Sequence, residues 1–177
     1  MEIYTSPPLD VAAPGAAGGA TVAVFDRADL IFHGVDHSGP SFTARVYLAH
    51  PEADAATPTT AEAGYAGCFT IFGHGGCVGT DDDHCNPKAR TVDDFDLRMP
   101  HPLLPQTKVV TVTEALRRLG PVSQVTVTVV PVVPGETGPE VTDALSFTTL
   151  RLAVYRDDRR LEEDMEEEEA VSGSHPG

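Results

Sequence analysis

The strongest constraint on the fold is a pair of short segments in which apolar and polar residues alternate. In residues 41–50 (SFTARVYLAH), one set of alternate positions is apolar: Phe42, Ala44, Val46 and Leu48. Successive side chains of a β-strand point to opposite faces, so this pattern predicts a strand with one buried face. Residues 124–133 (QVTVTVVPVV) alternate threonine and valine in the same way. Because proline has no N–H to donate, we expect Pro131 at an edge or beyond the paired part of that strand.

Further strands are predicted wherever β-branched and aromatic residues cluster between turn signals. These segments are a pair in 20–33 with a break at 26–28, then 65–72, 108–112 and 145–155. Residues 33–40 (HGVDHSGP) read as a turn. Residues 65–72 read as a buried strand, in which Gly67 predicts a close approach by a neighbouring strand. With seven or eight short strands, the chain is predicted to be all-β, a single antiparallel β-sandwich.

One short helix is predicted over residues 113–119. Thr113 is its expected N-cap, Glu114 lies in the first turn, and Arg117 and Arg118 lie in the last turn. The pair Gly120-Pro121 that follows is a typical helix stop.

Composition divides the chain into three parts. Residues 1–19 are rich in proline, glycine and alanine and read as a flexible leader without a secretory signal. Residues 20–156 form the predicted sandwich. Residues 157–177 read as a disordered acidic tail, because residues 162–169 (EEDMEEEE) hold seven carboxylates in eight positions.

The charge and hydropathy of the chain argue against two classes of partner. The net charge is −15, and the few basic residues are scattered, so neither nucleic acid nor an anionic lipid surface is an expected partner. The chain contains no run of 18 apolar residues, so no membrane span is expected. Without a signal segment the expected location is cytoplasmic, with secretion alongside a partner as the alternative.

The chemically richest segment is the glycine-rich loop 73–85 (GHGGCVGTDDDHC). It contains His74, Cys77, His84 and Cys85, a ligand set that suits zinc or copper. The spacing H-x2-C-x6-H-C differs from common structural zinc patterns, and a Cys77–Cys85 disulfide is the favoured alternative. A third alternative leaves the thiols free, since three cysteines, with Cys68, make an odd count.

The other groups of histidine, aspartate and serine residues do not form a recognisable site. His33 and His37 are four residues apart, but Gly34 and the sequence Ser38-Gly39-Pro40 make a helix that would pair them improbable, so two loop histidines are expected. The aspartates at 81–83 lack EF-hand spacing and read as solvated. No serine has a nucleophile-elbow motif and no phosphate loop opens a helix, so the sequence gives weak support for enzyme chemistry.

Four segments in a fixed order resemble a known family. They are Leu30–Pro51, Gly64–Cys77, Leu97–Leu116 and Gln124–Val130. Together they resemble the C-terminal β-sandwich domain that follows the dicopper helical bundle in tyrosinases, polyphenol oxidases and molluscan hemocyanins. The sharpest motif is A-G-x-F-x-x-x-G, here Ala66, Gly67, Phe69 and Gly73. The resemblance covers about residues 20–155.

The resemblance implies a non-catalytic accessory domain that covers or regulates a dicopper oxidase active site, or aids its copper loading. The partner it implies is a tyrosinase-like dicopper oxidase subunit or domain, with copper as the associated metal. The chain departs from whole oxidases because the helices that carry the six copper-binding histidines have no counterpart here, so phenol oxidase activity is not transferred to it. Some fungal members carry a copper-handling cysteine pair in this domain, but Cys77 and Cys85 are eight apart rather than in a C-x-x-C.

Two points stay open at this stage. Tyr65 and Phe72 flank the loop and are the candidates for a side chain that enters the oxidase pocket. The alternative function is a stand-alone copper- or zinc-binding protein that uses His74, Cys77, His84 and Cys85.

Overall fold

The computed structural model describes residues 2–11, 25–74, 104–134 and 144–156. Within these ranges the chain forms nine strands and one helix, in the order β1 (Tyr4–Thr5), β2 (Leu9–Asp10), β3 (Arg27–Val35), β4 (Phe42–Leu48), β5 (Tyr65–Ile71), β6 (Gln106–Thr111), α1 (Thr113–Arg118), β7 (Gln124–Val125), β8 (Val127–Val132) and β9 (Thr149–Tyr155). In the described ranges, no helix is both long and apolar enough to cross a membrane.

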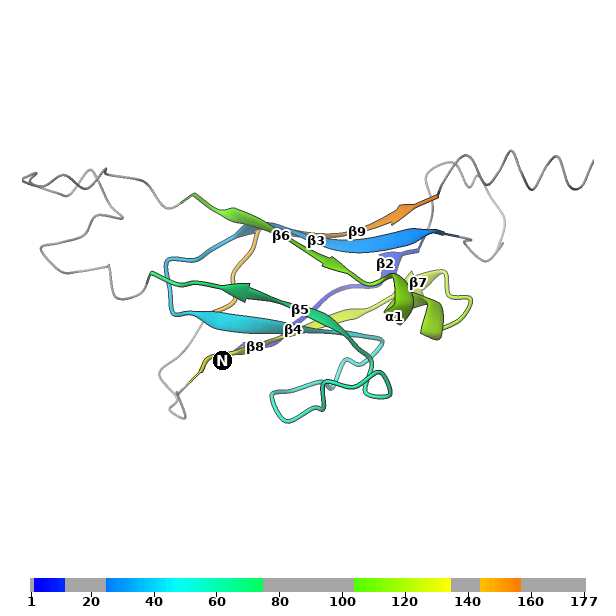
Figure 1. Cartoon of the computed structure of the whole chain (residues 1–177), viewed down its shortest axis with the longest axis horizontal. Helices are drawn as coiled ribbons and strands as arrows, with labels where there is room; N and C mark the ends of the chain where they lie inside the picture. Colours follow the sequence, from blue (N-terminus) through cyan, green and yellow to red (C-terminus); the bar gives the residue numbers. More distant parts are fainter. Residues whose placement is uncertain (1, 12–24, 75–103, 135–143, 157–177) are drawn as a thin grey trace, which may run out of the picture.

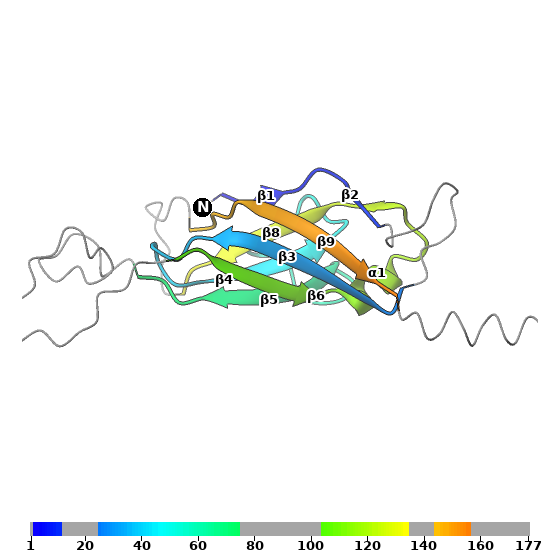
Figure 2. The ribbon, with the colours of Figure 1, turned by 90° about the horizontal axis from the view of Figure 1, so that it is seen from above.

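The strands form two facing layers, which confirms the predicted all-β sandwich (Figure 1). One layer is a four-stranded sheet in the order β1-β8-β4-β5, and the other is a three-stranded sheet in the order β6-β3-β9. The short pair β2-β7 adds a third sheet. Every pairing between these strands is antiparallel. The edge strands β5 and β6 lie on the same side of the sandwich, as the view from above shows (Figure 2).

The core lies between the two layers and follows the alternation in the sequence. In β4 the predicted inward side chains Phe42, Ala44, Val46 and Leu48 are all buried. Phe32 of β3 faces them from the other layer, and its ring centroid lies 4.8 Å from that of Phe69 in β5. These rings bury large apolar areas, so they contribute strongly to the free energy of folding.

Strand β3 differs from its prediction at both ends. The break expected at residues 26–28 is the start of one continuous strand, in which Arg27 pairs with Tyr155. The turn expected from His33 begins later, because β3 runs to Val35. The register shifts between Phe32 and Val35, and Gly34 has a φ of +68°. A glycine tolerates this left-handed conformation, so the strand continues through a bulge where a turn was predicted.

The prediction of a flexible leader over 1–19 is wrong for residues 2–11. Tyr4 pairs with Val129 in β8, and Leu9 pairs with Val125 in β7. The Tyr4 ring centroid lies 4.8 Å from that of Phe147, and Val11 is 5% exposed in the core. These few apolar side chains tie a proline-rich segment to the domain. Residues 12–19 and the acidic segment 157–177 lie outside the described residues.

The predicted helix is confirmed, but its N-cap is not. The helix α1 begins at Thr113, and the N-cap position is Val112, which makes no side-chain cap. The hydroxyl of Thr113 instead accepts a hydrogen bond from the buried N–H of Ala28, at 3.0 Å. At the other end Gly120 has a φ of +74° and donates its N–H to Arg117 O, which is the predicted stop.

Strand β5 lies at the edge of its sheet, although its residues predicted a buried strand. Of its side chains only Phe69 and Ile71 are buried, because one face of β5 and its free edge look outward. The predicted close approach at Gly67 is confirmed, since a Cβ there would lie 2.8 Å from Cγ1 of Val110 in β6. Because Gly67 has no side chain, β5 and β6 can approach each other closely along this side of the sandwich.

Candidate functional site

The end of β5 is fastened to the turn between β3 and β4. Gly73 donates its N–H to the hydroxyl of Ser41 at 3.0 Å, and His74 donates its N–H to His37 O at 2.9 Å. A Cβ at Gly73 would collide with backbone atoms of Gly39 and Pro40, so only glycine allows this contact. The A-G-x-F-x-x-x-G motif therefore ends at a backbone junction. The first two residues of the glycine-rich loop are held in place.

This junction brings together two histidines that lie 37 positions apart in the sequence. Nδ1 of His37 lies 3.2 Å from Nδ1 of His74, and the two ring centroids are 5.0 Å apart. Nε2 of His37 lies 2.9 Å from Leu104 O, just before β6. A carbonyl oxygen only accepts hydrogen bonds, so Nε2 of His37 carries a hydrogen, and in the neutral ring Nδ1 keeps its lone pair.

The turn that carries His37 is held by its neighbour Asp36. The Asp36 carboxylate accepts hydrogen bonds from the Ser38 N–H and the Ser38 hydroxyl, both at 2.9 Å. The backbone bond from Ser38 lowers the pKa of Asp36 below its usual value, while partial burial acts in the opposite direction. His37 is only 7% exposed. The imidazole is thus positioned by its turn and by Leu104 O together.

Two large apolar side chains flank this pair and point into solvent. Phe72 is 78% exposed, and its ring centroid lies 5.8 Å from that of His74. Leu104, whose carbonyl oxygen receives the His37 hydrogen bond, is 70% exposed. We call this region, formed by residues 36–41, 72–74 and 104, the histidine end. In Figure 1 the β3–β4 turn, the end of β5 and the start of β6 lie at the end opposite α1.

The predicted site residues fall in different places. His74 is at the histidine end, whereas Cys77, His84 and Cys85 lie outside the described residues, so the metal set and the disulfide both stay predictions. His33 and His37 are not paired with each other: His33 is exposed in β3, and His37 contacts His74. Among the described residues no group of three or more histidine, cysteine or acidic side chains is placed to hold a metal.

The two candidate aromatic residues lie at opposite ends of β5. Phe72 is at the histidine end, but Tyr65 begins the strand near α1, where Arg118 donates a hydrogen bond to its carbonyl at 3.4 Å. Burial, with a side-chain hydrogen bond involving Cys68, raises the pKa of Tyr65 to about 12. Cys68 is an exposed free thiol.

The contact between His37 and His74 was not predicted. No local sequence pattern links the two residues, so His37 was interpreted as an isolated loop histidine.

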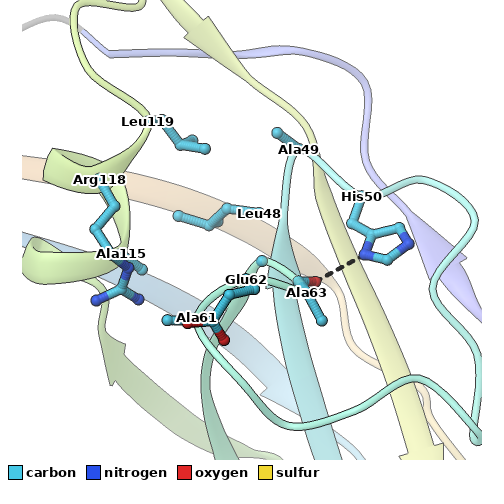
Figure 3. A pocket seen from close by; sticks show the side chains of 10 residues that line it. Leu48, Ala49, His50, Ala61, Glu62, Ala63, Ala115, Arg118 and Leu119 are labelled. Atoms are coloured by element: carbon cyan, nitrogen blue, oxygen red, sulfur yellow. Dashed lines mark hydrogen bonds between the residues drawn. The ribbon is translucent and has the colours of Figure 1, made fainter.

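A small cavity of about 210 Å³ lies at the other end, between the β4–β5 connection and α1. Its lining combines apolar side chains such as Leu48 and Leu119 with the charged side chains of Glu62 and Arg118 (Figure 3). Nδ1 of His50 donates a hydrogen bond to Ala63 O at 2.7 Å, which fixes that ring at the rim. The cavity is below the usual size of small-molecule sites, about 300–1,000 Å³. His74, the predicted metal ligand that lies among the described residues, does not line it.

Comparisons with known proteins give a likeness of fold alone. No protein-family model matches the chain, and no curated protein sequence matches it. Among solved structures it is similar to a latent aurone synthase (polyphenol oxidase) from natural source, with 14% identity, a TM-score of 0.46 and coverage of 87% of this chain. The recombinantly expressed enzyme co-crystallised with hexatungstotellurate(VI) matches at 16% identity with a TM-score of 0.47. This chain spans 24% of the length of each of these polyphenol oxidases.

Proposed function

We propose that this chain is a non-catalytic accessory domain that docks on a tyrosinase-type dicopper phenol oxidase and covers its active-site entrance. The observation that carries the proposal is the apolar pair at the histidine end, where Phe72 is 78% and Leu104 is 70% exposed. Exposed apolar side chains that gather on a rigid support are typical of protein-binding surfaces. They are the two most exposed of the large apolar side chains in the described part of the chain.

The nature of the partner is supported by the sequence resemblance. The sharpest motif, from Ala66 to Gly73, runs along β5 and ends beside Phe72. In the resembled domains the sandwich packs over the entrance to the dicopper site. A surface at the end of β5 is therefore the part of this chain that we expect to face an oxidase.

Phe72 is well placed to act as the covering side chain. The N–H of its neighbour Gly73 donates a hydrogen bond to the Ser41 hydroxyl, and the N–H of His74 donates one to His37 O. These bonds fix the backbone that carries the phenyl ring, so little conformational entropy would be lost when the ring enters an apolar opening. A phenyl ring in the entrance would compete with a phenol substrate for the same space.

The test uses the full chain and a separately purified dicopper phenol oxidase from the same source. We expect the chain to bind the oxidase and to lower its rate of diphenol oxidation, measured by calorimetry and by oxygen uptake. Phe72→Ser should weaken binding at least tenfold, because burial of a phenyl ring is worth about 1.5–3 kcal/mol.

The matched control is Tyr155→Ser, which removes an exposed aromatic ring at the last residue of β9, the strand end on the α1 side in Figure 1. This variant should bind and inhibit like the native chain. Absence of binding, or equal effects of the two substitutions, would rule out docking through the histidine end. A rise in the copper content of the oxidase without inhibition would replace the covering role with copper loading.

A further inference from the structure

The two ring nitrogens at the histidine end are spaced like two ligands of one metal ion. Zinc–nitrogen bonds are about 2.0–2.1 Å long, so two nitrogens on a tetrahedral ion lie about 3.3 Å apart. The observed separation between Nδ1 of His37 and Nδ1 of His74 is 3.2 Å. A third donor atom, His37 O, lies 3.3 Å from Nδ1 of His74. Both of these distances match edges of a tetrahedral coordination shell.

His37 has the arrangement of a metal-binding histidine. Metal-ligating histidines usually donate the hydrogen of their second ring nitrogen to a carbonyl or carboxylate oxygen, which fixes the tautomer and directs the free lone pair. Nε2 of His37 makes this bond to Leu104 O at 2.9 Å, and its Nδ1 points toward His74. The ring is 7% exposed, so its orientation is set by packing as well.

We infer that His37 and His74 form a binding site for a borderline divalent cation such as Zn²⁺, with Nδ1 of each ring as a ligand. When the ion binds, His74 carries its ring hydrogen on Nε2 rather than Nδ1, so no net proton is released from the neutral pair. Without the ion, Nδ1–H of His74 donates to Nδ1 of His37. Water fills the coordination positions that the protein leaves open.

The charges around the pair favour a cation. Asp36, the residue before His37, places a carboxylate next to the pair, and Ser38 holds that carboxylate through two hydrogen bonds of 2.9 Å. The ligand chemistry also sets the class of ion. Two imidazoles suit zinc, copper and nickel, whereas Mg²⁺ and Ca²⁺ prefer oxygen ligands.

The test titrates the full chain with Zn²⁺ by calorimetry, with Mg²⁺ as the control ion. Because Cys77, His84 and Cys85 also suit zinc, the titration is repeated on a chain in which all three are replaced, Cys77→Ser, His84→Ala and Cys85→Ser. We expect this chain to bind one Zn²⁺ and no Mg²⁺. Failure to bind Zn²⁺ with a Kd below about 1 mM would overturn the inference.

Single substitutions then locate the ion in the same background. His37→Gln and His74→Gln should each weaken Zn²⁺ binding at least about tenfold. His33→Gln in β3 and His50→Gln near α1 are the matched controls and should leave the affinity unchanged. Equal affinity in the His37→Gln chain would place the ion elsewhere.

A readout on the unsubstituted chain guards against misfolded variants. In long-range ¹H–¹⁵N spectra of the histidine rings, Zn²⁺ should shift the Nδ1 resonances of His37 and His74, while the Nε2 resonance of His37 stays that of a protonated nitrogen. Shifts confined to other histidines would contradict the site. This experiment uses the chain alone, so its result is independent of docking on an oxidase.

Discussion

At the scale of single residues, Gly64 sets how the 49–64 connection meets β5. Its φ is +75°, and a Cβ at this position would lie 2.6 Å from Leu48 O. The same backbone junction holds a hydrogen bond from Leu48 N–H to Gly64 O at 2.9 Å. A side chain here would therefore meet both a left-handed backbone and a contact with main chain that cannot rotate away.

We expect Gly64→Ala to lower the free energy of unfolding by about 1–3 kcal/mol. The measurement is chemical denaturation followed by far-UV circular dichroism. Gly39→Ala is the matched control, because a Cβ at Gly39 has no atom within 4 Å. Equal losses at the two glycines would contradict the role assigned to Gly64.

Tyr65 supplies a pH dependence at the same scale. Burial raises its pKa to about 12, above the usual value for tyrosine of about 10. The unfolded chain therefore loses this proton first as pH rises. The contribution of Tyr65 to stability is fully present below about pH 10 and is lost as the pH approaches 12.

Tyr65→Phe should flatten the fall of stability between about pH 10 and 12, because phenylalanine has no proton to lose. The midpoint of urea unfolding measured at several pH values in that window gives the slope. Tyr155→Phe, which changes an exposed tyrosine, should keep the native slope. If both variants kept it, Tyr65 would not be the group responsible.

At the scale of elements, α1 is attached to β3 through its first residue. The hydroxyl of Thr113 accepts the N–H of Ala28, and Val112 N–H donates to Ala28 O at 2.8 Å. Near the other end of the helix, Arg117 donates to Phe25 O at 3.1 Å and Asp26 O at 3.2 Å. A helix of six residues is too short to be stable alone, so these bonds and the buried side chain of Leu116 hold it.

Thr113→Val should destabilise the chain by about 1–3 kcal/mol, because the substitution leaves the buried N–H of Ala28 without an acceptor at almost constant volume. The control is Thr111→Val at an exposed position of β6. Thermal unfolding by calorimetry compares the two. A Thr113 variant as stable as the control would show that water replaces the hydroxyl.

At the scale of the whole molecule, the sandwich depends on residues 2–11, a segment whose composition predicted a flexible leader. Residues 2–11 add β1 to one sheet and pair β2 with β7 (Figure 2). Ser6 contributes in two ways: its hydroxyl accepts the buried N–H of Val127 at 2.9 Å, and its N–H donates to Val127 O at 2.9 Å. The N-terminal segment therefore closes an edge that β8 would otherwise expose.

A chain that lacks residues 1–11 should lose on the order of 3–5 kcal/mol of stability, because the apolar contacts of Tyr4, Leu9 and Val11 are removed. A chain that lacks only residues 1–3 keeps β1 and should stay close to native stability. Denaturant unfolding of both truncated chains checks this. If both behaved alike, the N-terminal strands would add little.

Several features could be predicted because they depend on neighbours in the chain. Alternation in residues 41–50 predicted the buried face of β4, and Gly120 predicted the end of α1, since period and backbone conformation are local properties. The same alternation places Tyr47 on the outer face, and this is wrong. Tyr47 is fully buried, because the 49–64 connection folds over it and Thr57 O accepts its hydroxyl hydrogen at 3.0 Å.

The sequence by itself thus determined the all-β fold class, the short helix and the close approach at Gly67. Only the tertiary structure decided that residues 4–10 join the sheets and that His37 meets His74. The residues in these contacts are separated in the sequence by 37 positions in one case and by more than 100 in the others. Their pairing depends on packing and backbone hydrogen bonds, which no local sequence pattern predicts. The histidine end is therefore a product of the fold, even though the glycine that permits it, Gly73, stands in a motif visible in the sequence.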